Sequence, residues 1–92
     1  MQNNITISYA ILACDESVEL EKLLPFLKQH KQKDDEIVVM LDDENYTAMV
    51  DEVAGKYADR VSYRKLNKDF ASQKNALTDL CEGDYIFNID AD

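Results

Sequence analysis

Apolar residues in this chain gather in seven segments, and their spacing alternates between two periods. In four segments they run together or alternate with polar residues, which predicts strands over 5–13, 36–41, 61–65 and 84–89. The three segments between them repeat apolar residues every three or four positions, as on one face of a helix. Strands that alternate with helices predict a parallel sheet with right-handed crossovers and helices on both faces.

The four strands differ in how continuously apolar they are. ITISYAILA and EIVVML are apolar almost throughout, as strands buried on both faces should be. VSYRK alternates, which favours an edge of the sheet, and the run Tyr85-Ile86-Phe87 in the last strand is typical of a buried segment. We therefore predict an α/β fold, a Rossmann-like three-layer sandwich with a four-stranded parallel sheet in the order 3-2-1-4.

The first helix has a clear apolar stripe and two candidate starts. Asp15 or Ser17 can cap its N-terminus. Pro25 lies inside the pattern and is expected to kink the helix or split it in two. The apolar positions fall at i, i+3, i+4 and i+7: Leu20, Leu23, Leu24 and Leu27.

The other two helices are predicted over 44–57 and 70–81. Asp69 can cap the second of them. Gly83 is well placed for the turn that follows it. Each helix thus returns the chain to the start of the next strand.

Ligands of such sheets bind outside the carboxyl ends of the strands. Acidic residues follow three of the four strands at this edge: Asp15 with Glu16, Asp42 with Asp43, and Asp90 with Asp92. The chemistry visible in the sequence is therefore acidic and lies on one rim of the sheet.

Asp90 and Asp92 form a D-x-D pair directly after a strand. They are either two solvated aspartates in a turn or part of a cation site, since hard cations such as Mg²⁺ or Mn²⁺ prefer carboxylate oxygens. In the second case Asp92 would ligate the metal, and Asp90 would reach the ligand or a metal-bound water.

Three further residues on this rim are candidates for contacts to a nucleotide. A carboxylate at Asp42 can accept an N–H or hydroxyl from a nucleoside, while Asp43 can instead cap the following helix. Lys74 lies early in its helix, where it either contacts phosphate or is simply solvated. The chain has no G-x-G-x-x-G or P-loop motif, so a pyrophosphate bound here would need a metal.

Composition narrows the class of protein. With 92 residues the chain forms one small domain, and its net charge of −9 disfavours nucleic acid as a partner. Cys14 and Cys81 are unpaired by spacing and are read as reduced, which suits a cytoplasmic protein. The apolar N-terminal run has no basic residues before it, so neither a signal peptide nor a membrane span is predicted.

The segment DFASQKNALTDLCEGDYIFNIDAD, residues 69–92, resembles the family-two glycosyltransferases, which have the A-type nucleotide-sugar fold. It has in order a helix with a Lys-Asn pair, a G-D-Y turn, an apolar strand and a terminal D-x-D. ITISYAILA and EIVVMLDD fit the same frame, so the resemblance spans nearly the whole chain. It is closest in pattern to transferases that build lipopolysaccharide cores and other surface glycans.

The resemblance implies that residues 1–92 are the donor-binding part of a transferase, ending at the D-x-D motif and holding no catalytic residue. The acceptor-binding half and its base lie downstream in family members. A nucleotide-diphosphate sugar, with a UDP-sugar favoured, would bind together with Mg²⁺ or Mn²⁺. The acceptor would be a glycan or a lipid-linked molecule, and the full-length protein could associate peripherally with a membrane.

The resemblance also assigns individual residues. Asp42 would hold the base, Lys74 would lie by the nucleotide, Asp90 would contact the ribose or the metal shell, and Asp92 would bind the metal.

Two stretches depart from the family pattern. After the first strand, family members usually have a T-Y-N-E-like stretch, whereas this chain has Ala13-Cys14-Asp15-Glu16. Glu16 of this stretch is assigned to the nucleotide-sugar site. Asp43-Glu44-Asn45 replaces a Gly-Ser turn, so Asp43 is an alternative to Asp42 as the base contact. The rival interpretations are a nucleotidyltransferase-like nucleotide-binding domain and a non-catalytic interaction module.

Overall fold

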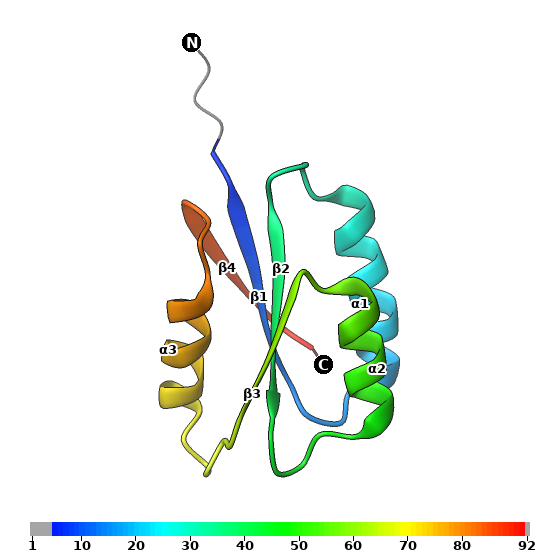
Figure 1. Ribbon diagram of the computed structural model, residues 1–92, viewed down its shortest axis with the longest axis vertical. Helices are drawn as coiled ribbons and strands as arrows, with labels where there is room; N and C mark the ends of the chain where they lie inside the picture. The colour runs from blue at the N-terminus through cyan, green and yellow to red at the C-terminus, as the bar shows by residue number, and fades with distance from the viewer. Residues whose placement is uncertain (1–4, 92) are drawn as a thin grey trace.

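A computed structural model describes residues 5–91 and confirms the predicted architecture. Four parallel strands form one sheet in the order β3-β2-β1-β4, and three helices connect them (Figure 1). The elements in chain order are β1 (Ile7–Ala13), α1 (Ser17–His30), β2 (Glu36–Asp42), α2 (Ala48–Tyr57), β3 (Arg60–Arg64), α3 (Phe70–Leu80) and β4 (Tyr85–Asp90).

The helices cover the two faces of the sheet unequally. α1 and α2 lie on one face and α3 lies on the other (Figure 1). Because side chains alternate along each strand, the sheet contributes to two separate apolar clusters. Ile11, Val39 and Leu41 pack toward α1 and α2, while Ala10 and Val38 pack toward α3 with Leu77. β2 is buried on both faces, as its continuous apolar sequence predicted.

α1 is a single helix whose start differs from both predictions. Its N-cap is Glu16, and no side chain caps it, because Glu16 Oε1 instead accepts the backbone N–H of Cys14 at 2.7 Å. Capping by Asp15 or Ser17 was therefore wrong. Pro25 does not split the helix either, since Leu24 and Leu27 on either side of it are buried against the sheet and hold both halves in place.

α2 begins four residues later than predicted. Thr47 is its N-cap, and the Thr47 side chain accepts the N–H of Val50 at 3.2 Å. Asp43, proposed as an alternative cap, does not cap this helix. Residues 43–45 form a turn instead, held by hydrogen bonds to Asp42.

The cap of α3 was predicted correctly, but the reason for Gly83 was not. Asp69 accepts the N–H of Ser72 at 3.0 Å. Gly83 does not adopt a left-handed conformation. A Cβ atom at this position would lie 2.7 Å from the backbone nitrogen of Ser8, so glycine is required by close approach to β1.

β4 is an exposed edge strand, which corrects the expectation that its aromatic residues are buried. Tyr85 and Phe87 are 63% and 58% exposed. By register they share the face of the sheet that α1 and α2 cover elsewhere, with Phe87 beside Tyr9 at 6.1 Å between ring centroids. We call the exposed side of this strand, with Tyr85 and Phe87, the open face of β4. β4 is the last strand in the order 3-2-1-4, and this edge position leaves its aromatic side chains exposed although the strand is apolar in composition.

A polar network ties together the amino-terminal ends of the strands. Glu36 on β2 accepts hydrogen bonds from Ser8 Oγ on β1 and from Arg60 Nη2 on β3, both at 2.5 Å. It also accepts the backbone N–H of Glu82, at 2.6 Å, from the turn before β4. Burial alone would raise the pKa of Glu36, but these three donors outweigh it and lower the pKa.

We expect Glu36→Gln to destabilise the protein at neutral pH by about 1–2 kcal/mol, since it removes charge-assisted hydrogen bonds that join three strands. Because the folded pKa lies below the unfolded value of about 4.3, the contribution is complete well above that pH. It is lost as pH falls through the folded pKa.

Urea unfolding at pH 7 and at pH 3 measures both effects, and the difference in stability between the wild type and the variant should be smaller at the lower pH. Glu82→Gln is the control, because the Glu82 side chain is 81% exposed and its carboxylate lies 3.8 Å from the Arg60 guanidinium, farther than that of Glu36. An equal loss in both variants would contradict the role of the network.

Candidate functional site

The candidate site is a groove at the carboxyl edge of the sheet, formed by three adjoining cavities. The Lys74 cavity, of about 440 Å³, is lined by Leu12, Glu16, Phe70, Ala71, Lys74, Asp90 and Ala91. A middle cavity of about 70 Å³ shares Leu12, Glu16 and Phe70 with it and also contains Cys14, Asp42 and Gln73. The Asn45 cavity, of about 400 Å³, is lined by Asp42, Glu44, Asn45, Leu66, Asn67 and Lys68. Neighbouring cavities share lining residues, and we call the three together the rim groove.

Asp42 occupies the centre of the rim groove and is 94% buried, with 6% of its surface exposed. Asp42 Oδ1 accepts the backbone N–H groups of Glu44 and Leu66, both at 3.2 Å. Oδ2 accepts the side-chain amide of Asn45 at 2.9 Å. The Asn45 bond is the main reason that the pKa of Asp42 is lowered, so the carboxylate stays ionised and joins two loops.

Asp43 lies apart from this groove. Its side chain is exposed and lines none of the three cavities, and its backbone N–H donates to the carbonyl of Arg64 at 3.2 Å. Of the two aspartates considered for contact with a base, Asp42 lines the rim groove and Asp43 does not.

Glu16 and Cys14 follow β1 directly and both line the middle cavity. Glu16 also lines the Lys74 cavity, and its hydrogen bond to the Cys14 N–H holds it against the end of β1. Burial raises the pKa of the Cys14 thiol, and the nearby charges of Asp15, Asp42 and Glu16 raise it further. Cys14 is thus a protonated thiol that donates to the Asn45 carbonyl at 3.3 Å.

Lys74 and Asp90 come together in the Lys74 cavity from elements distant in sequence. Lys74 lies in the second turn of α3 and Asp90 is the last residue of β4, and both side chains are exposed. Lys74 is the one cationic side chain in the described lining of this cavity. Asp92, the predicted metal ligand, lies outside the described residues.

The fit of this rim to a divalent cation rests on carboxylates. Across residues 5–91, no three side chains of the ligating types gather closely enough to hold an ion by themselves. Asp90 and Glu16, on one cavity, supply the oxygen donors that Mg²⁺ and Mn²⁺ prefer, so the donor chemistry fits such an ion.

Sequence reasoning missed two features of the rim groove. Gln73 is 98% buried and makes two hydrogen bonds with Arg64. Its Oε1 accepts from Arg64 Nη1 at 2.8 Å, and its Nε2 donates to the Arg64 backbone carbonyl at 2.6 Å. Asn67 and Lys68 in the next loop both have positive φ angles, 51° and 58°. The spacing of Gln73 and Leu77 on one helical face could have indicated the first feature, but no local pattern indicates the second.

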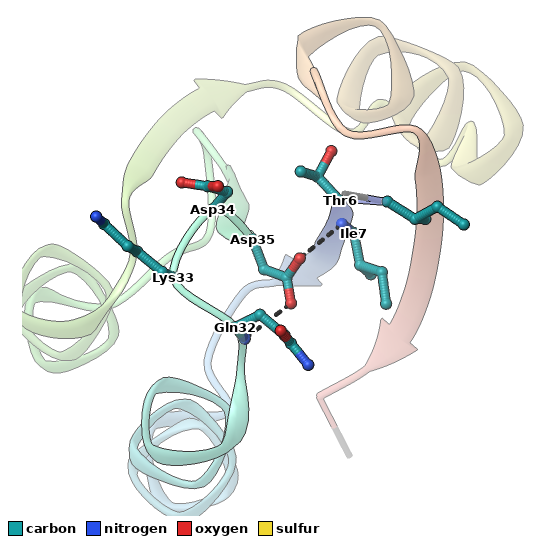
Figure 2. A pocket seen from close by; sticks show the side chains of 7 residues that line it. Thr6, Ile7, Gln32, Lys33, Asp34 and Asp35 are labelled. Carbon is teal, nitrogen blue, oxygen red and sulfur yellow. Dashed lines mark hydrogen bonds between the residues drawn. The ribbon is translucent and has the colours of Figure 1, made fainter. Parts of the chain in front are cut away.

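A further cavity lies at the opposite edge of the sheet and is not a candidate site (Figure 2). It has about 480 Å³ and is lined by residues 5–7 and 32–35. Its buried carboxylate, Asp35, already accepts the backbone N–H of Ile7 at 2.8 Å and of Gln32 at 2.9 Å, as the dashed lines in Figure 2 show. These bonds close the α1–β2 turn onto β1, so Asp35 has a structural role.

Comparison with protein-family models matches residues 8–92 to glycosyl transferase family 2. The chain belongs to this family. The match runs from the second residue of β1 through β4 and therefore includes every residue that lines the rim groove. A search of curated proteins gives no significant match.

Membership of glycosyl transferase family 2 establishes the general chemistry. The protein is a glycosyltransferase domain that takes a nucleotide-sugar donor and serves an acceptor. Among the residues described, no helix is long and apolar enough to cross a membrane.

Proposed function

We propose that the rim groove binds a uridine diphosphate sugar, with the base at Asp42 and the diphosphate at Lys74. The observation that carries this proposal is the placement of Lys74 and Asp90 on one cavity that shares lining residues with the middle cavity, where Asp42 lies. In parallel α/β sheets, ligands occupy this edge, so the position agrees with the general rule.

The charges along the groove match the parts of such a donor. A nucleoside offers N–H and hydroxyl donors, which an ionised carboxylate such as Asp42 accepts. The diphosphate is anionic and needs positive charge, because the chain as a whole carries −9. Lys74 supplies one such charge at the N-terminal half of α3.

A divalent cation, Mg²⁺ or Mn²⁺, would be held by Asp90 and Asp92, with Glu16 on the same cavity. Bound there, it would neutralise the diphosphate as the leaving group. Asp90 would position the ribose or a water near the ion, and Lys74 would hold a phosphate oxygen.

The remaining parts of the proposal rest on the family. We propose that residues 1–92 are the donor-binding part of a hexosyltransferase that acts on a glycan or lipid-linked acceptor of the cell envelope. We also propose that the full-length protein is cytoplasmic, with peripheral attachment to a membrane. A nucleotidyltransferase would need a glycine-rich phosphate loop, which the sequence lacks, and this favours sugar transfer.

We expect uridine diphosphate to bind in the presence of Mn²⁺ and to lose binding in a chelator, because an acidic rim repels the anion without a cation between them. Asp92→Asn should weaken binding more than Asp90→Asn, and at least one of them by about tenfold. Isothermal titration calorimetry on the three proteins measures this.

Asp79→Asn is the matched control, since Asp79 is an exposed aspartate of α3 that does not line the rim groove. Equal affinity with and without chelator would reject the metal. Absence of binding under both conditions would reject the donor site.

A further inference from the structure

We propose that Asn45 reads the base together with Asp42, forming an acceptor–donor pair in which the carboxylate accepts N3–H of uracil and the amide donates to O4. This inference rests on the proposed donor site. It adds a specificity-determining residue in the turn after β2, at a position where family resemblance assigns no contact.

The hydrogen bonds of Asp42 determine which of its oxygens is available. Oδ1 already accepts two backbone N–H groups, from Glu44 and Leu66. Oδ2 accepts one bond, from Asn45 Nδ2 at 2.9 Å. A carboxylate oxygen has about two acceptor positions, so Oδ2 can take one more donor.

The same bond fixes the orientation of the Asn45 amide. An ionised carboxylate can only accept, so Asn45 must turn its NH₂ group toward Asp42. One N–H is used in this bond, and the amide nitrogen that carries the second lies 2.9 Å from Oδ2. An acceptor and a donor therefore stand next to each other, and both residues line the Asn45 cavity of about 400 Å³.

This arrangement is complementary to the imide edge of uracil. N3–H and O4 are a donor and an acceptor on adjacent atoms, and O4 is on the side of the base away from the ribose. Asp42 is buried whereas Asn45 is exposed, so Asp42 provides a fixed anchor and Asn45 closes over the base from the rim. Once the base covers it, such a polar pair discriminates between ligands, because a ligand that lacks the matching group leaves the pair without its hydrogen bonds.

The test compares uridine diphosphate with 4-thiouridine diphosphate, in which sulfur is a weaker acceptor than O4. Calorimetry in Mn²⁺ is carried out on the wild type, Asn45→Ala and the matched control Asn88→Ala, an exposed asparagine on β4 outside the groove. We expect the wild type to prefer uridine diphosphate. Asn45→Ala should weaken that ligand by about 3- to 10-fold and remove the preference, and Asn88→Ala should change neither.

Inorganic pyrophosphate separates this inference from the donor site. Its affinity should be unchanged in Asn45→Ala, because it has no base. If uridine diphosphate binds but the preference over the thio analogue survives in Asn45→Ala, Asn45 only tethers Asp42 and the inference is wrong. Equal loss for pyrophosphate and uridine diphosphate would also overturn it. If the wild type binds neither ligand, the donor site itself fails.

Discussion

Lys74→Glu is expected to reduce the affinity for uridine diphosphate by about 100-fold or more. The substitution replaces the cation of the Lys74 cavity with a carboxylate, beside Asp90 and Glu16. The diphosphate would then face three acidic side chains at close range, and a single divalent ion could not balance them. Calorimetry in saturating Mn²⁺ measures the loss.

The control for this experiment is Lys22→Glu on the exposed surface of α1. It changes the net charge by the same amount but lies outside the rim groove. If both variants weakened binding equally, the effect would come from the overall charge, and Lys74 would have no specific contact. Lys74→Arg should retain most of the affinity, because it keeps the charge.

Gly83→Ala is expected to destabilise the fold by about 2–4 kcal/mol, a large part of the stability of a domain of this size. The added Cβ would lie 2.7 Å from both the backbone nitrogen and the Oγ of Ser8, and 3.0 Å from the Ile7 carbonyl carbon. Two of these three atoms belong to the backbone of β1, so neither can move aside easily. The turn would have to shift and lose the bond from the Gly83 N–H to Ser8 Oγ, now 2.8 Å.

Thermal or urea unfolding tests this against Gly55→Ala. A Cβ on Gly55 meets nothing within 4 Å, and the residue lies inside α2, so alanine there should stabilise the protein by about 0.5–1 kcal/mol. Opposite signs for the same chemical change would show that the two glycines serve different purposes. A Gly83→Ala variant as stable as the wild type would mean that β4 can move away from β1 without cost.

The fold could be predicted from the sequence because its main determinants are local. The continuous apolar run of β2 requires burial on both faces, and the alternation of strands with helices requires parallel pairing. The start of α2 could not be predicted, because it depends on which donors Asp42 captures across the turn. Likewise, Tyr85 and Phe87 have the composition of core residues, and only their place at the sheet edge exposes them.

For the candidate site, the sequence indicated which residues lie on the rim but not which hydrogen bonds they make with one another. The carboxyl ends of parallel strands bring Glu16, Asp42 and Asp90 to one edge, which is a property of the topology. The hydrogen bond between Asp42 and Asn45 could not be foreseen, since it depends on the path of a loop. The bond from Leu66 to Asp42 joins residues 24 positions apart, and no periodic pattern reports such a contact.

The open face of β4 makes the tendency of the protein to aggregate depend on salt concentration. An edge strand with exposed aromatic side chains is a template on which a second strand can pair, and Asp84 and Asp90 at its two ends oppose this through like charge. The net charge of −9 adds a repulsion that reaches about 30 Å at 0.01 M salt but only about 3 Å at 1 M. Concentrated salt therefore removes the barrier to aggregation through this edge, and dilute buffer preserves the dispersed protein.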